Sequence, residues 1–197
     1  MTSRLCFRRK IASQTRNAWD GSQSNQRAMP TFASIRLQIS YPALWLLPCS
    51  LPSLKVLLRG LLSAVQSTEE GSQIAGLELH LVDDNAIAKA NQRYLGCHGP
   101  TNILSFPGGD ELPGTLLLSL DTFARECRLY AQPEACHLVH LLSHGTAHLA
   151  GLEHGVHHTA LQNVCLAALI AEPPPELASS IALLTNEVAC SQSELRV

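Results

Sequence analysis

The segment from His144 to His154, which reads HGTAHLAGLEH, constrains the fold of this chain more than any other feature. His144 and His148 are four residues apart, so on a helix both imidazoles project from one face. Gly151 allows the chain to turn out of the helix, and His154 follows three residues later. We predict that these three histidines bind one metal ion and leave a fourth position open, as catalytic zinc sites do.

The same spacing occurs in the metzincin proteases, whose pattern is HExxHxxGxxH and whose glutamate after the first histidine is the general base. The corresponding residue here is Gly145, which has no side chain. The sequence therefore predicts a zincin-like metal helix that lacks the base required for ordinary peptide hydrolysis.

The bulk properties of the chain limit its class. A length of 197 residues, of which 46% are hydrophobic, predicts a single domain whose core does not need zinc to fold. No apolar run reaches the roughly 18 residues of a membrane span. The seven cysteines are scattered and include no CxxC pair, which indicates free thiols and a reducing, cytoplasmic location.

The charges are unevenly distributed along the chain. Residues 1–68 contain nine Lys or Arg residues and one acidic residue, whereas residues 69–197 contain five and fifteen. Residues 1–29 show no hydrophobic period and are predicted to be a disordered basic extension. Three explanations stay open for it: an arm that meets a polyanion, an organelle transit peptide, or an upstream extension with translation starting at Met29. We favour the last, because a predicted strand begins almost directly after Met29.

Hydrophobic periodicity predicts an α+β domain over residues 30–172, with a small mixed sheet and about five helices. Asp83 and Asp121 are expected to cap the helices that follow them, and Pro133 suits the first turn of the metal helix. Residues 173–197 form a tail that we expect to be dispensable and that has room for one more helix. Four strands are predicted at 34–40, 76–82, 102–106 and 115–120, and helices at 52–66, 85–95, 121–130, 134–150 and 158–171.

Two motifs resemble the YbeY family of bacterial rRNA maturation factors, which are single-domain zinc endoribonucleases. Residues 140–154, HLLSHGTAHLAGLEH, are similar to the family's HLxVHGxLHLxGYDH. Residues 100–107, PTNILSFP, are similar to its PT[DN]VLSFP. The resemblance covers about residues 33–171 and implies a small sheet with helices packed on it.

The resemblance also implies a function. We expect one zinc ion per chain, held by His144, His148 and His154, and single-strand-specific cleavage of RNA in 16S rRNA 3′-end maturation and ribosome quality control. The implied partners are rRNA and the ribosome, through its small subunit or that subunit's proteins, and no membrane. The alternative is a non-catalytic ribosome assembly factor that zinc stabilises. A peptidase is a third possibility, against which Gly145 argues.

The chain departs from the family pattern at two positions, and the first, Leu95, favours taking the alternative seriously. Where the family usually has an arginine thought important for RNA cleavage, this chain has Leu95. Arg93 is two residues earlier, on roughly the opposite side of a helix. Thr115 stands where the family usually has an acidic residue.

Four residues are weak candidates for a catalytic role: Glu153, Ser105, Asn102 and Arg93. Glu153 is either an acceptor that orients an imidazole, a general base or a solvated surface acid. Asn102 and Ser105 either line the cleft opposite the metal helix or bond to the backbone.

The remaining histidines near the motif have less specific roles. His140 continues the face of His144 and is either a fourth ligand or, as we favour, a residue that supports the site from outside the ligand set. His137, His157 and His158 are expected at the surface or at helix caps, with His157 or His158 within reach of substrate.

Overall fold

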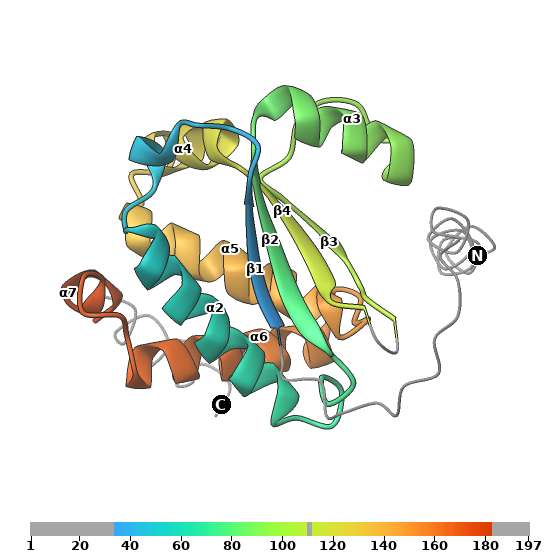
Figure 1. Cartoon of the computed structure of the whole chain (residues 1–197), viewed down its shortest axis with the longest axis vertical. Coiled ribbons are helices and arrows are strands. Elements are labelled where there is room, and N and C mark those ends of the chain that lie inside the picture. The colour runs from blue at the N-terminus through green and yellow to red at the C-terminus, as the bar shows by residue number, and fades with distance from the viewer. Residues whose placement is uncertain (1–33, 110–111, 183–197) are drawn as a thin grey trace, which may run out of the picture. The chain divides into compact units, whose positions relative to one another are not determined.

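The computed structural model describes residues 34–109 and 112–182, all within the unit Phe32–Val197. The predicted extension 1–29 and most of the tail lie outside the described residues. Within them are four strands, six α-helices and one 3-10 helix (Figure 1). The strands are β1 (Ser34–Ile39), β2 (Gly76–Val82), β3 (Ile103–Phe106) and β4 (Gly114–Ser119). The helices are η2 (Leu44–Leu46), α2 (Leu51–Gln66), α3 (Asp84–Leu95), α4 (Leu120–Leu129), α5 (Glu134–Leu149), α6 (Val156–Ala171) and α7 (Ala178–Ile181).

The four strands form one mixed sheet in the order β1-β2-β4-β3. β1, β2 and β4 run parallel, and β3 pairs antiparallel with β4 at the edge. The predicted α+β class, with a small mixed sheet of four strands, is confirmed.

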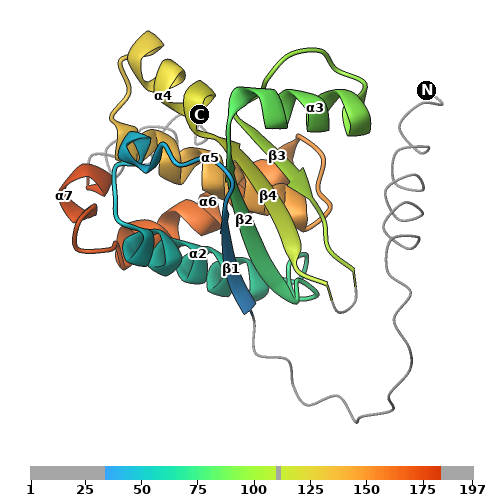
Figure 2. The same cartoon turned by 45° about the horizontal axis from the view of Figure 1, so that its top comes forward.

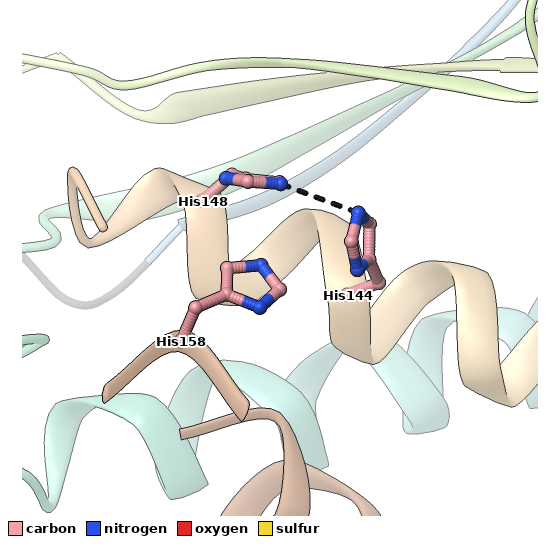
Figure 3. A group of neighbouring side chains, drawn as sticks. All are labelled: His144, His148 and His158. Carbon is pink, nitrogen blue, oxygen red and sulfur yellow. Dashed lines mark hydrogen bonds between the residues drawn. The ribbon is translucent and has the colours of Figure 1, made fainter. Parts of the chain in front are cut away.

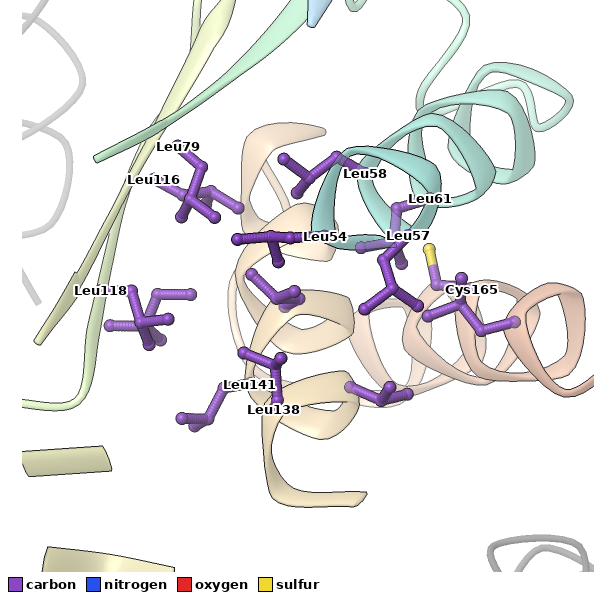
Figure 4. Packing of buried hydrophobic residues seen from close by; sticks show 14 of the residues in the cluster. Leu54, Leu57, Leu58, Leu61, Leu79, Leu116, Leu118, Leu138, Leu141 and Cys165 are labelled. Atoms are coloured by element: carbon purple, nitrogen blue, oxygen red, sulfur yellow. The ribbon is translucent and has the colours of Figure 1, made fainter. Parts of the chain in front are cut away.

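Helices cover both faces of the sheet (Figure 2). Because successive side chains on a strand point to opposite faces, β4 separates two clusters. Leu116 and Leu118 belong to the main core with α2, α5 and α6, whereas Leu117 packs with the cluster under α3. Figure 4 shows the main core, in which leucines of the sheet face leucines of α2 and α5. The histidines of α5 lie on the side of the sheet that α2, α5 and α6 cover.

α5 is the central helix of that layer, in contact with β3, β4, α2 and α6. Most of its residues are buried, on more than one face, because the sheet lies on one side and two helices on the other. Such a position holds the backbone of α5 rigidly, and therefore also the histidines that it carries.

Two predicted helix starts are corrected. Asp121 does not cap α4: the Ser119 hydroxyl accepts a hydrogen bond from the Thr122 amide at 3.2 Å, because β4 passes directly into the helix. Asp121 lies in the first turn, where its charge still favours the helix dipole. Pro133 occupies the capping position before α5 rather than the first turn.

The beginning of the tail packs on the domain. The side chains of Leu177 and Ile181 are 1% and 0% exposed and belong to the main core, next to α5 and α6. The short helix allowed for in the tail is α7. Five cysteines are free thiols among the described residues. No helix in the described part of the chain is long and apolar enough to cross a membrane.

Candidate metal centre

His144 and His148 lie one turn apart near the C-terminal end of α5, as their spacing predicts. Their rings meet edge to face, and their Nε2 atoms are 3.2 Å apart. Both side chains are half-buried, so the pair is open to a ligand on one side.

The turn at Gly151 places His154 close to His144 and His148. The amide of Gly151 bonds to the carbonyl of His148 at 2.9 Å, and Gly151 has a φ of +76°, which only glycine adopts readily. The chain then places the exposed His154 so that its Nε2 atom is 3.4 Å from that of His144. The structure thus brings all three predicted ligands together.

The spacing of these nitrogens fits a tetrahedral metal ion. Zinc–nitrogen bonds of about 2.0–2.1 Å in a tetrahedral arrangement place two ligand nitrogens about 3.3–3.4 Å apart. The nitrogen separations of 3.2 Å for His144–His148 and 3.4 Å for His144–His154 are close to that value. Both separations from His144 therefore suit a zinc-sized ion.

A backbone contact outside the ligand set orients the ring of His148. The Nδ1 atom of His148 donates to the carbonyl oxygen of Leu152 at 2.8 Å, because a carbonyl can only accept. In the neutral ring this leaves the Nε2 lone pair free for a metal. The side chain of Gln162 on α6 lies near the ring of His144 and acts to raise its pKa. Sequence reasoning missed Gln162, since nothing in its local pattern marks it.

The surroundings keep the two α5 histidines neutral. Burial lowers the pKa of His144, and so do the nearby charges of His148, His154 and His140 when those rings are protonated. The pKa of His148 is also lowered, chiefly by burial. Neutral imidazole is the form that binds metals, so the pair is prepared for a cation near neutral pH.

His158 corrects a prediction. Instead of lying at the surface or capping a helix, its side chain is 2% exposed and packs against the cluster. Its ring centroid lies 4.2 Å from that of His148 and 4.6 Å from that of His144. The reason is its place on the buried stripe of α6, which continues at Leu161 and Cys165. That helical spacing is the sequence pattern that could have revealed it.

Two groupings of histidines are thus present. The Nε2 contacts join His144 to His148 and to His154, whereas the ligand atoms of His144, His148 and His158 all lie within 4.8 Å of one another (Figure 3). Nε2 of His154 lies 3.4 Å from that of His144, so His154 stays the predicted third ligand. His140 is exposed, and His157 is exposed as predicted.

The packing of Gly145 explains the missing protease base. A Cβ atom at this position would lie 2.8 Å from Cδ1 of Ile103, 3.0 Å from Cδ2 of Leu116 and 3.1 Å from the Ser105 hydroxyl. A side chain at Gly145 would therefore force the ends of the Ile103 and Leu116 side chains to shift. A carboxylate here would have to enter this packed space between α5 and the sheet.

The other candidate residues are placed as follows. Ser105 faces α5 at Gly145, one residue from His144 along the helix. Asn102 is held in a network: its amide donates to the Glu126 carboxylate at 3.1 Å, and its side-chain oxygen accepts from the Ile103 amide at 2.7 Å. Of the two alternatives for Asn102, the structure shows the bond to the backbone.

His137 is a second correction, because it is buried rather than at the surface. Its Nε2 atom lies 2.9 Å from the same Glu126 carboxylate, and its ring stacks on Phe123.

Arg93 and Leu95 lie at the C-terminal end of α3, on the face of the sheet opposite to α5. Both are exposed, and the guanidinium of Arg93 lies 5.5 Å from the ring centroid of Tyr94. Glu153 is exposed in the turn between His148 and His154. The structure therefore places only Glu153 and Ser105 beside the histidine cluster.

Comparisons with known proteins identify the family of this chain. Residues 48–163 match the family model described as Endoribonuclease YbeY. The protein of that name from Lawsonia intracellularis is 48% identical over 86 residues, which are 43% of this chain and 65% of the relative. The one from Nitratidesulfovibrio vulgaris is 38% identical over 162 residues, covering 69% of this chain and 96% of the relative. A solution structure of a Thermotoga maritima protein aligns with 72% of this chain and 95% of its own, at 20% identity and a TM-score of 0.46.

Proposed function

Since this chain belongs to the YbeY endoribonuclease family, we propose that it is a zinc-dependent endoribonuclease that cleaves single-stranded RNA. The observation that carries the proposal is the cluster of His144, His148 and His154, whose nitrogen separations suit one tetrahedral ion. We further propose that it acts in the cytoplasm, on the 3′ end of 16S rRNA and in ribosome quality control, with the small subunit as partner.

Each residue of the centre has a defined task in this proposal. His144, His148 and His154 would hold the ion, which when bound polarises a phosphoryl oxygen and lowers the pKa of a coordinated water. The Leu152 carbonyl keeps the ring of His148 in the orientation that presents Nε2 to the ion. The exposed side of His154 is where an RNA strand reaches the site.

The absence of a carboxylate at Gly145 is compatible with RNA cleavage. An RNA strand carries its own nucleophile, the ribose 2′-hydroxyl, and needs less help from a protein base than an amide does. Glu153, in the turn beside His154, is the carboxylate nearest in sequence to the cluster and is available to accept a proton or to orient a ring. Ser105, behind Gly145, is better placed to support the packing of α5 on β3.

One specific observation favours a second candidate function. Leu95 replaces the arginine that the family pattern usually has, and Arg93 lies with it on the far face of the sheet from the cluster. A chain without that arginine suits a ribosome assembly factor in which zinc only stabilises the fold. A peptidase is disfavoured by the packing at Gly145.

Cleavage of a labelled rRNA fragment separates these functions. We would compare wild type with His148→Ala, and with His157→Ala as a matched control, since His157 is an exposed histidine nearby on α6. The nuclease proposal expects cleavage by wild type and His157→Ala and its loss in His148→Ala. Equal, minimal cleavage by all three proteins, each with bound zinc, would instead favour the assembly factor. Hydrolysis of casein would instead support a peptidase function.

A further inference from the structure

The proposed centre leaves one of the four clustered histidines without a task. The side chain of His158 is 2% exposed, and its Nε2 atom is buried and has no hydrogen-bond partner. A buried polar atom without a partner is unfavourable, and native structures rarely keep one without a reason. A cation that accepts the lone pair of this nitrogen would remove the deficit.

The position of His158 matches that role. Its ring centroid lies 4.2 Å from that of His148, 4.6 Å from that of His144 and 5.2 Å from that of His154. Figure 3 shows the rings of His144 and His148, from α5, and of His158, from α6, gathered around one space. His158 is thus in contact with every ring of the proposed ligand set.

We propose that His158 is a fourth ligand of the metal ion, so that the resting centre contains four imidazoles. The inference rests on the metal centre of the proposed function and deepens it. Four protein ligands close a tetrahedral site, whereas a catalytic site needs one position for water or substrate. RNA cleavage would then require one imidazole to leave the ion. A closed resting site would have no position for a reactive water, so that activity would depend on the binding of RNA.

Cobalt spectroscopy tests the coordination without measuring activity. The full chain, loaded with Co²⁺, is compared as wild type, His158→Leu and the control His157→Leu, with and without azide. Leucine fills a comparable volume at position 158 with an apolar side chain that cannot bind a metal. We expect azide to leave the spectra of wild type and His157→Leu unchanged and to shift that of His158→Leu saturably. Equal azide affinity in wild type and His158→Leu would overturn the proposal.

Thermal melting gives a second readout from the same variants. Metal-free His158→Leu is expected to melt at or above metal-free wild type, because the substitution removes an unpaired buried nitrogen. Added Zn²⁺ should raise the melting temperature of wild type and His157→Leu more than that of His158→Leu. An equal rise in all three proteins contradicts a ligand role for His158.

X-ray absorption at the zinc edge needs no variant, and so decides the matter even if His158→Leu does not fold. We expect four imidazole nitrogens around zinc in the wild-type protein. Three imidazoles and one oxygen would overturn the role of His158 while leaving the proposed function intact. Failure of the wild-type protein to bind zinc at all would overturn both.

Discussion

The Nδ1 atom of His148 lies 2.8 Å from the carbonyl oxygen of Leu152, so the turn after α5 fixes the orientation of the His148 ring. This contact connects the backbone conformation of residues 150–155 with the direction of a metal-binding nitrogen. It also ties two ligands together, because the same turn carries His154. The glycines of the turn are therefore expected to influence metal affinity although they touch no metal.

Gly151→Ala tests this coupling. Alanine at a φ of +76° is strained by about 1–2 kcal/mol, and relief of the strain would move the Leu152 carbonyl and His154. We expect a lower urea midpoint and a roughly 10-fold weaker zinc affinity, as for changes in contacts that orient ligands. Gly109→Ala is the control, since a Cβ there meets no atom within 4 Å. Unchanged zinc affinity in Gly151→Ala would refute the coupling.

Gly145→Ala tests the close packing of α5 on the sheet. Overpacking costs about 1–3 kcal/mol, and the better helix propensity of alanine offsets about 1 kcal/mol of it. The closest contact of the new Cβ is Cδ1 of Ile103, which Ile103→Val removes. We expect Gly145→Ala to be destabilised in wild type and less so, or not at all, in the Ile103→Val background. Additive effects in this double-mutant cycle would contradict the proposed contact.

Gly145→Glu introduces the glutamate of the protease pattern. It should not produce a peptidase, because the carboxylate would have to enter the space between α5, Ile103 and Leu116. We expect a larger loss of stability than for Gly145→Ala and no hydrolysis of casein. A stable variant with casein activity would show that the packing argument is wrong.

Asp84 provides a pH-dependent part of the stability. Burial alone would raise its pKa, but hydrogen bonds from Ser119, Thr122 and Arg125 lower it below 3.8. A carboxyl with a lowered folded-state pKa stabilises the fold above its unfolded pKa, and this contribution is lost as the pH falls through the folded value.

Asp84→Asn should therefore lower the unfolding free energy at pH 7 by at most about 1.5–3 kcal/mol, the range for hydrogen bonds to a charged group. The difference from wild type should shrink below about pH 4, where the wild-type carboxyl begins to be protonated. Urea unfolding between pH 7 and pH 3 measures it, with the exposed Glu70→Gln as control. A difference that stays constant down to pH 3 would contradict the assignment.

The tail contributes to the core through α7. Ile181→Ala removes a fully buried side chain and should cost about 2–5 kcal/mol, measured by urea unfolding. Ser179→Ala, on the exposed side of the same helix, is the control and should change stability by less than about 0.5 kcal/mol. Equal stability of the two variants would restore the expectation that the tail is dispensable.

Local patterns in the sequence predicted much of this structure. The alternation at residues 34–40 predicted β1, and the spacing of His144 and His148 predicted a shared helix face. Asp83 was recognised as a cap, and it caps α3 through the Ala86 amide. These features depend on residues within a few positions of one another, where helix and strand periods act directly.

What the sequence left unpredicted depends on contacts between distant segments. His158 is buried because α6 folds back on α5, and Gln162 reaches His144 for the same reason. The steric limit at Gly145 requires Ile103 and Leu116, which are more than 25 residues away in sequence. His137 and Asn102 both contact the Glu126 carboxylate, which connects them. The helical period of α6 marks the burial of His158, but no local period marks the other partners.

The central claim is that a metal ion held by these histidines takes part in RNA cleavage, and a zinc titration tests it most directly. Metal-free protein would be titrated with Zn²⁺ while cleavage of a labelled rRNA fragment is followed. We predict no cleavage without metal, a linear rise in cleavage with added zinc and a plateau at one ion per chain. His144→Ala should show neither the rise nor the plateau. Equal cleavage by the metal-free and zinc-loaded proteins would contradict the account.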